Sequence, residues 1–198
     1  MKSVDFTEES CKFEKYSIKI TVDNIYTVNS ADNPKKYDHT LTPSFVQRGD
    51  MYKVLDISVA GPNSYSLALI GSNYTYQDSC AILEGSILTV LQNDHIIRID
   101  LDTVQIIKEY EIDMCGIAFG IYSVKGGYII YGEVEILKLD LDYRKLWSFS
   151  GKDIFVSATG KRAFELTKKS IKLYDFEDNF YELDYDGNVL KRRVRFFK

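Results

Sequence analysis

The sequence predicts an all-β protein built from antiparallel four-stranded units, and three observations lead to this fold class. The 198 residues include fifteen Tyr and eleven Phe but only three Pro, and aromatic and β-branched residues favour pleated, half-buried surfaces. Short segments that alternate apolar and polar residues are separated by Gly or Asn-Asp turns, as in strands joined by tight hairpins. One such pattern recurs along the chain. No window keeps a helical period for more than two turns, so we expect little or no helix.

The recurring pattern is an alternating strand followed by an Asp-x-Asp turn. The three copies read I-I-R-I-D-L-D-T-V-Q-I-I-K from residue 96, I-L-K-L-D-L-D-Y-R-K-L-W-S from residue 136 and F-Y-E-L-D-Y-D-G-N-V-L-K-R from residue 180. Their first aspartates, Asp100, Asp140 and Asp184, recur about every 40 to 45 residues, a period typical of β-propeller blades. Four candidate strands lie between the first two copies. We therefore expect blade-like repeats in an incomplete or small propeller-like array, with a two-sheet β-sandwich as the alternative.

The N-terminal part is less regular. Residues 1–11 are polar, and we expect a frayed segment or an edge. Residues 12–28 alternate as a strand does, and the Asp23-Asn24 pair is expected to turn the chain into a second strand, residues 25–28. Residues 29–43 hold two prolines and few apolar side chains, which predicts a loop, and residues 46–59 resume a weaker strand pattern. We expect one domain, residues 1–198, with irregular strands over 12–80 and blade-like repeats over 81–198.

After the turn Gly61-Pro62-Asn63, the predicted strands follow one another closely. Their ranges are 65–70, 74–76, 79–83, 87–91, 96–101, 104–110, 117–124, 128–131, 135–141, 145–149, 154–158, 163–167, 170–176, 180–185 and 189–196. The apolar residues beside the paired aspartates are predicted to lie mainly on inward or inter-blade faces: Ile97, Ile99, Leu101, Leu137, Leu139, Leu141, Tyr181, Leu183 and Tyr185.

Two resemblances add expectations to this pattern. Residues 80–198 resemble the blades of tryptophan-aspartate-repeat and quinoprotein-type propellers, although the diagnostic Gly-His and Trp-Asp dipeptides are absent and Trp147 is followed by Ser148. The segment I-K-L-Y-D-F-E-D-N-F-Y-E-L-D-Y-D-G-N-V-L, residues 171–190, resembles the C-terminal portion of small bacterial immunity proteins of polymorphic toxin systems. The second resemblance implies a protein that binds a toxin domain and blocks it.

No catalytic or metal-binding motif stands out, so we expect a non-enzymatic protein without a cofactor. His39 and His95 are interpreted as exposed turn residues, and Cys80 and Cys115 as inert buried thiols. The segment from Asp184 opens like a calcium loop, but Arg195 occupies the position of its bidentate glutamate, so a hairpin turn is predicted.

Compartment and broad partner class follow from other features. The odd number of cysteines, without a C-x-x-C pair, and a start that lacks an apolar signal core predict a cytoplasmic protein. No apolar run is long enough for a membrane helix, so no membrane association is expected. The basic C-terminus K-R-R-V-R-F-F-K is interpreted as a guarded edge strand rather than a nucleic-acid strip.

The placement of acidic residues predicts the partner. The net charge is −4, and residues 94–142 hold ten acidic and four basic residues. Equivalent turns of successive repeats lie on one face, so the paired aspartates are expected to form an acidic surface for a basic toxin domain, with no nucleic acid as partner. Alternatively, Asp simply suits polar turns. The predicted binding residues are Asp100, Asp102, Asp140, Asp142, Tyr143, Trp147, Asp184, Tyr185 and Asp186. Two other functions stay open: a small enzyme with an unrecognised site, and a structural interaction scaffold.

Overall fold

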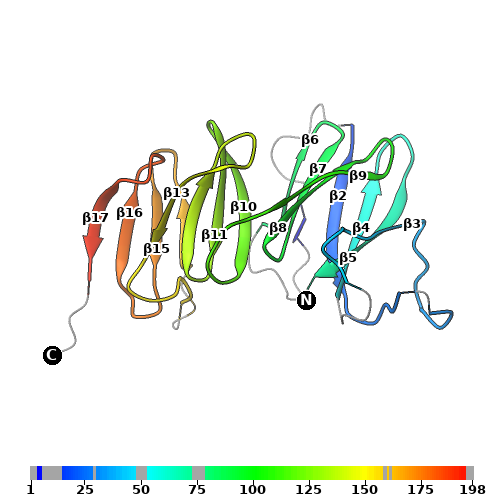
Figure 1. The fold of residues 1–198 in the computed structure, drawn as a ribbon, viewed down its shortest axis with the longest axis horizontal. Coiled ribbons are helices and arrows are strands. Elements are labelled where there is room, and N and C mark those ends of the chain that lie inside the picture. The colour runs from blue at the N-terminus through cyan, green and yellow to red at the C-terminus, as the bar shows by residue number, and fades with distance from the viewer. Residues whose placement is uncertain are drawn as a thin grey trace. The chain divides into compact units, whose positions relative to one another are not determined.

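The computed structural model describes residues 4–5, 15–28, 30–47, 53–72, 79–157, 160 and 162–194. These residues form strands β1 to β17 and contain no helix, so the predicted all-β class is confirmed (Figure 1). Within this part of the chain, no helix is present that could cross a membrane. The chain divides into two compact units, Met1–Glu111 and Ile112–Lys198. We describe each unit by itself, and the expectation of a single domain stays a prediction.

The first unit contains two sheets. Sheet A has the strand order β1-β2-β4-β5-β3, and its strands are β1 (Val4–Asp5), β2 (Ser17–Asp23), β3 (His39–Leu41), β4 (Lys53–Ala60) and β5 (Tyr65–Ser72). It is antiparallel except for β3, which pairs in parallel with β5. Sheet B is an antiparallel meander of β6 (Ala81–Glu84), β7 (Ile87–Gln92), β8 (His95–Asp100) and β9 (Gln105–Glu111).

The core of the first unit lies between these two sheets. Alternate residues of β2, such as Ile18 and Ile20, are buried while their neighbours are exposed, as expected for a strand with one wet face. They pack in one cluster with Leu55 and Leu67 of sheet A and with side chains of sheet B such as Ile97. A second, smaller cluster forms where the segment after β2 packs on Val54, Ala68 and Ile70, using Tyr26, Tyr37 and Val46.

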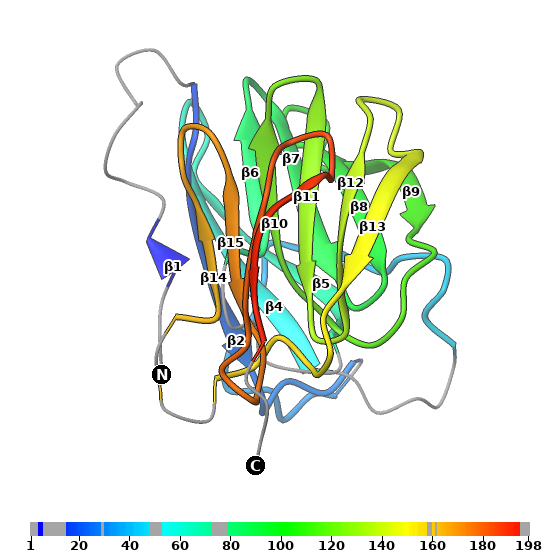
Figure 2. The same cartoon turned by 90° about the vertical axis from the view of Figure 1, so that its left-hand side faces the viewer.

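The second unit repeats the four-stranded meander twice. Sheet C consists of β10 (Ala118–Val124), β11 (Gly127–Gly132), β12 (Glu135–Leu139) and β13 (Lys145–Ser150). Sheet D consists of β14 (Phe164–Leu166), β15 (Ile171–Tyr174), β16 (Phe180–Leu183) and β17 (Val189–Arg193). In both sheets the strands lie in chain order and pair antiparallel. Figure 2 shows the meander of sheet D, coloured orange and red, facing the viewer. The predicted blade-like, four-stranded repeats are thereby confirmed.

Sheets C and D enclose the core of the second unit. Ile129, Tyr131 and Ile136 of sheet C pack in one cluster with apolar side chains of sheet D. The members from the C-terminal half of the unit are Phe155, Phe164, Ile171, Leu173, Tyr181 and Leu183. The central strands β11 and β12 are buried along their whole length. β11 accordingly reads as a nearly continuous apolar run, whereas β12 also buries the charged residues Glu135 and Lys138.

The structure corrects two predicted strands and one predicted loop. Residues 25–28 form no strand, because the Asp23 carboxylate accepts the backbone N–H groups of Ile25 and Tyr26 at 2.9 and 3.0 Å and turns the chain. The predicted loop 29–43 contains β3. Residues 154–157 form no strand although Phe155 is completely buried, since its N–H donates to the Glu133 carbonyl in a loop. The predicted strand 74–76 and most of residues 1–11 lie outside the described residues.

The predicted interior positions are confirmed with one clear exception. Side chains such as Ile97, Leu137 and Leu183 are completely buried. Leu141, by contrast, is 67% exposed, because β12 ends at Leu139 and Leu141 lies in the following turn. The prediction for Leu141 was therefore wrong. Tyr185 is half-buried.

The pair Leu139 and Leu141 gives a test of this register. Replacing Leu139, which is 2% exposed, by Ala should lower the free energy of unfolding by about 2–5 kcal/mol, because it leaves a cavity. The same change at exposed Leu141 should alter it by less than about 0.5 kcal/mol. Chemical denaturation of both variants measures this difference, and equal losses would contradict the register of β12.

Candidate functional site

The paired aspartates form turns of one construction. Each pair lies between the third and fourth strands of a sheet: β8–β9, β12–β13 and β16–β17. The first aspartate accepts the backbone N–H of the second at 2.8, 2.8 and 2.9 Å in the three turns. Asp140 and Asp184 also accept the N–H of the residue four positions on, at 2.9 and 2.8 Å. The first aspartate of each pair therefore holds its turn closed.

Tyr143 is largely used inside its own sheet. It has a left-handed backbone with φ of 64°, a conformation that is unfavourable for a bulky side chain. Its ring stacks on Tyr128, with centroids 4.9 Å apart and planes at 6°, and it is 8% exposed. This packing offsets the backbone cost, and little of the ring is left to contact a partner.

Trp147 and Tyr185 join sheets C and D. The Tyr185 carbonyl accepts hydrogen bonds from Lys138 Nζ at 2.8 Å and Trp147 Nε1 at 3.3 Å. The Tyr185 hydroxyl donates to the Thr167 carbonyl at 2.7 Å. The indole also packs on Gly187, where a Cβ would lie 2.8 Å from Trp147 Cδ2. The Trp147 side chain and the Tyr185 carbonyl thus stabilise the contact between the two sheets.

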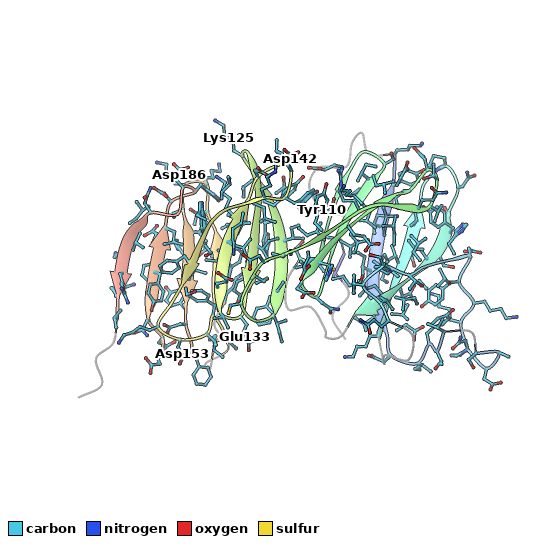
Figure 3. The ribbon with its side chains drawn as sticks, in the orientation of Figure 1. Tyr110, Lys125, Glu133, Asp142, Asp153 and Asp186 are labelled. Carbon is cyan, nitrogen blue, oxygen red and sulfur yellow. The ribbon has the colours of Figure 1, made fainter. Side chains whose placement is uncertain are left out.

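Four turns lie at one end of the second unit, because alternate turns of an antiparallel meander fall at the same end. We call it the aspartate-turn end (residues 124–127, 140–144, 167–170 and 184–188). Figure 3 shows Lys125, Asp142 and Asp186 there. Its four aspartates, Asp140, Asp142, Asp184 and Asp186, are matched by four basic residues, Lys125, Arg144, Lys168 and Lys169. This end is therefore charge-balanced rather than acidic.

Asp100 and Asp102 belong to the first unit, so a face shared by all six carboxylates stays a prediction. Lys15 Nζ and the Tyr16 hydroxyl donate to the Asp102 carboxylate. These bonds hold the pKa of Asp102 below its usual value. In the second unit, the Asn188 side chain donates to Asp184 at 2.9 Å and likewise lowers the pKa of that carboxyl. Both carboxylates are charged at neutral pH and engaged within the chain.

The opposite end of the second unit is the acidic one. We call it the acidic end, and it consists of residues 132–135, 151–157 and 175–179. Backbone bonds tie the three segments together: Phe155 N–H donates to the Glu133 carbonyl at 2.6 Å, and Phe176 N–H to the Ile154 carbonyl at 2.8 Å. Figure 3 shows Glu133 and Asp153 at this end, away from Asp142 and Asp186.

Charge and exposure make the acidic end distinct. Four acidic side chains reach solvent there, namely Glu133, Asp153, Glu177 and Asp178. Two described basic residues lie at this end: Lys152, and Arg162 just before β14, where Ala163 accepts the Tyr174 N–H. Phe176 stands among them and is 50% exposed. An exposed aromatic side chain beside mostly acidic groups is a composition found in protein-binding surfaces.

Among the residues that the structure describes, the histidines and cysteines form no reactive cluster. His39 and His95 both lie in strands, not in turns as predicted, and His95 is half-buried, stacked on Phe45 at 4.1 Å. Cys80 is buried, and burial raises the pKa of its thiol to about 12, as expected for an inert group. Cys115 is exposed, which corrects the prediction of a buried thiol. Among the described residues, no group of three or more potential ligands could hold a metal ion.

The predicted hairpin at Asp184 is confirmed. Strands β16 and β17 pair on either side of it, and Gly187 supplies the left-handed residue with φ of 87°. The carboxylate oxygens are used by the turn itself, through the N–H groups of Asp186 and Asn188.

Comparison with known proteins adds information on the fold alone. No protein-family model and no curated protein sequence matches the chain. Among solved structures, it is similar to BamB from Moraxella catarrhalis (9% identity, TM-score 0.45, 73% of this chain and 47% of that one). It is also similar to Raptor from Chaetomium thermophilum (14% identity, TM-score 0.48, 74% of this chain and 15% of that one). A third similar structure is the computationally designed Ika8 protein (10% identity, TM-score 0.47, 74% of this chain and 47% of that one). The chain spans less than half the length of each.

Proposed function

We propose that this chain is a non-enzymatic protein-binding module whose partner is a basic protein domain, bound at the acidic end of the second unit. The single observation that carries the proposal is the exposed Phe176 among Glu133, Asp153, Glu177 and Asp178. An aromatic anchor supplies binding energy at the centre of an interface. The surrounding carboxylates attract a cationic partner and speed its encounter.

The partner class that we propose is a bacterial toxin domain, so that the chain acts as a cytoplasmic immunity protein. Support comes from the resemblance of residues 171–190 to such proteins, a segment that includes Phe176 and Glu177. Domains that act on nucleic acids carry basic clefts, since they must attract phosphates. Carboxylates arranged around an aromatic ring are suited to cover such a cleft.

The surface proposed here differs from the one expected from the paired aspartates. In the second unit, the turn hydrogen bonds of Asp140 and Asp184 and the balancing basic residues leave little net attraction for a cation. A structural interaction scaffold is the second candidate. It is supported by the blade-like sheets, whose exposed turns and edges offer several separate surfaces.

The test uses the protein encoded next to this chain's gene, produced in a bacterial host with and without the chain. We expect the neighbour to arrest growth alone and the chain to restore it. With the purified pair, the variant Glu133→Gln/Asp153→Asn/Glu177→Gln should slow association roughly tenfold at low salt and flatten its salt dependence. Phe176→Ala should mainly speed dissociation, since it removes an anchor.

The matched control is Asp142→Asn/Asp186→Asn, which removes exposed carboxylates at the opposite end. We expect association within about twofold of the unmodified protein, because that end is charge-balanced. If the control slows association as much as the acidic-end variant, the aspartate turns contribute to the binding surface. If the neighbour is harmless but still binds, the module assignment survives and the immunity assignment fails.

A further inference from the structure

A second surface, independent of the acidic end, lies at the open edge of sheet D. β17 is the last strand in the sheet order and pairs with β16 alone within the part of the chain described. All five of its residues, Val189 to Arg193, are exposed. The outer edge of a strand presents N–H and C=O groups that can pair with another extended chain.

The arginines of β17 flank this edge. Arg193 lies opposite Phe180, and Arg192 opposite Tyr181. The guanidinium carbons lie 4.9 Å from the Phe180 ring centre and 5.6 Å from that of Tyr181. Because successive residues of a strand point to opposite faces, one cation lies over each face of the sheet. Both are drawn towards β16, so they leave the hydrogen-bonding edge of β17 open.

Two exposed apolar side chains precede the arginines. Val189 is 48% and Leu190 is 59% exposed. Leu190 stands in a bulge, because Leu183 pairs with Val189 and Glu182 with Lys191. Bulges re-aim a side chain and recur at sheet edges. The edge thus combines an open strand, an apolar contact and the cations Lys191, Arg192 and Arg193.

We propose that β17 receives an extended, acidic segment of a partner protein as an added strand. Such a segment would pair through its main chain, and its carboxylates on alternate faces would meet Arg192 and Arg193. A second copy of β17 fits poorly, since like charges facing each other across strands repel. Single-stranded nucleic acid is also disfavoured. Binding it relies on aromatic rings that are open to stack on bases, whereas Phe180 and Tyr181 are 6% and 0% exposed.

The full chain is titrated with a short labelled peptide of alternating glutamate and valine, followed by fluorescence anisotropy. A matched peptide carries N-methyl groups on alternate backbone nitrogens, so it keeps the charges and loses the donors that pair with an edge. We expect the first peptide to bind at least roughly tenfold tighter than the second. Amide hydrogen exchange should slow in β17 upon binding. Equal binding of the two peptides, or no binding, would overturn the proposal.

Variants of the chain locate the site. The variant Arg192→Glu/Arg193→Glu should bind the acidic peptide at least roughly tenfold more weakly. The variant Lys168→Glu/Lys169→Glu makes the same charge change in the β14–β15 turn of sheet D, and its affinity for the peptide should stay within about twofold of the unmodified chain. An equal loss in both variants would overturn the assignment to β17. Labelled oligothymidylate is titrated in parallel, and tighter binding of that strand than of the acidic peptide would show a nucleic-acid edge instead. The N-methyl comparison needs no protein variant and stays decisive if the arginine variant misfolds.

Discussion

Replacing Gly127 by Ala is expected to destabilise the second unit by roughly 4 kcal/mol or more. Gly127 begins β11 with φ of 149°, a backbone region that L side chains rarely adopt. A Cβ there would lie 1.9 Å from the Leu139 carbonyl oxygen and 3.0 Å from the Asp140 Cα. Both atoms are backbone at the β12–β13 turn, so relief of the clash requires that two neighbouring strands separate. Chemical denaturation monitored at Trp147 measures the loss.

The adjacent Gly126 provides the matched control. It also has positive φ, 80°, but a Cβ added there would meet nothing within 4 Å. Gly126→Ala should therefore cost only the backbone strain of about 1–2 kcal/mol. Comparable losses in the two variants would mean that conformational strain, and not the close approach of β11 to β12, makes glycine necessary at residue 127.

The strands of the repeated units were predictable because turn chemistry and alternation agree in them. For example, Ile97 and Ile99 alternate with Arg98 up to the turn at Asp100, and β8 follows that pattern. The recurring Asp-x-Asp correctly marked the turn between the third and fourth strands of sheets B, C and D. Side-chain to backbone bonds over two to four residues are local, so a sequence pattern is sufficient to indicate them.

Elements that depend on distant pairing could not be read in this way. β3 is short and polar, and it exists because it pairs in parallel with β5. The apolar residues around Phe155 predicted a strand, because an apolar pattern indicates which side chains are buried. A loop can also bury a side chain, and here it inserts the Phe155 ring into the core. The exposure of Leu141 followed from where β12 stops, and element ends are the least certain part of any sequence-based assignment.

The candidate site was missed for a related reason. Glu133, Asp153 and Glu177 come from three separate segments, and none of them belongs to a repeated motif. The meander topology brings them together, because alternate turns of antiparallel sheets fall at the same end. Once the chain is divided into four-stranded units, the turns after the first and third strands of each sheet can be assigned to one end and the other turns to the opposite end. The charges of the two ends can then be compared. For the second unit that comparison would have distinguished the balanced end from the acidic end.

Asp175 and Asp184 show how burial separates two turns with the same sequence pattern, D-x-x-x-N. In both, Oδ1 accepts the N–H groups two and four residues on, and Oδ2 accepts the Asn side chain. Asp184 is half-buried in the charge-balanced turn, where water can replace its bonds. Asp184→Ala should therefore lower the free energy of unfolding by only about 1 kcal/mol.

Asp175→Ala should lower the free energy of unfolding by roughly 3–5 kcal/mol, because Asp175 is 0% exposed and its carboxylate joins the acidic end to the core. Its Oδ2 also accepts the Tyr181 hydroxyl at 2.9 Å, and that hydroxyl in turn accepts the Lys152 N–H at 2.9 Å. Removing the carboxylate takes the acceptor from the buried Tyr181 hydroxyl and breaks the Asn179 Nδ2 bond of 2.9 Å. Asp175→Asn should recover only part of the loss, since its amide nitrogen would face another donor. Urea denaturation of the three variants gives the ranking, and a cost for Asp175→Ala no larger than for Asp184→Ala would contradict a buried carboxylate network.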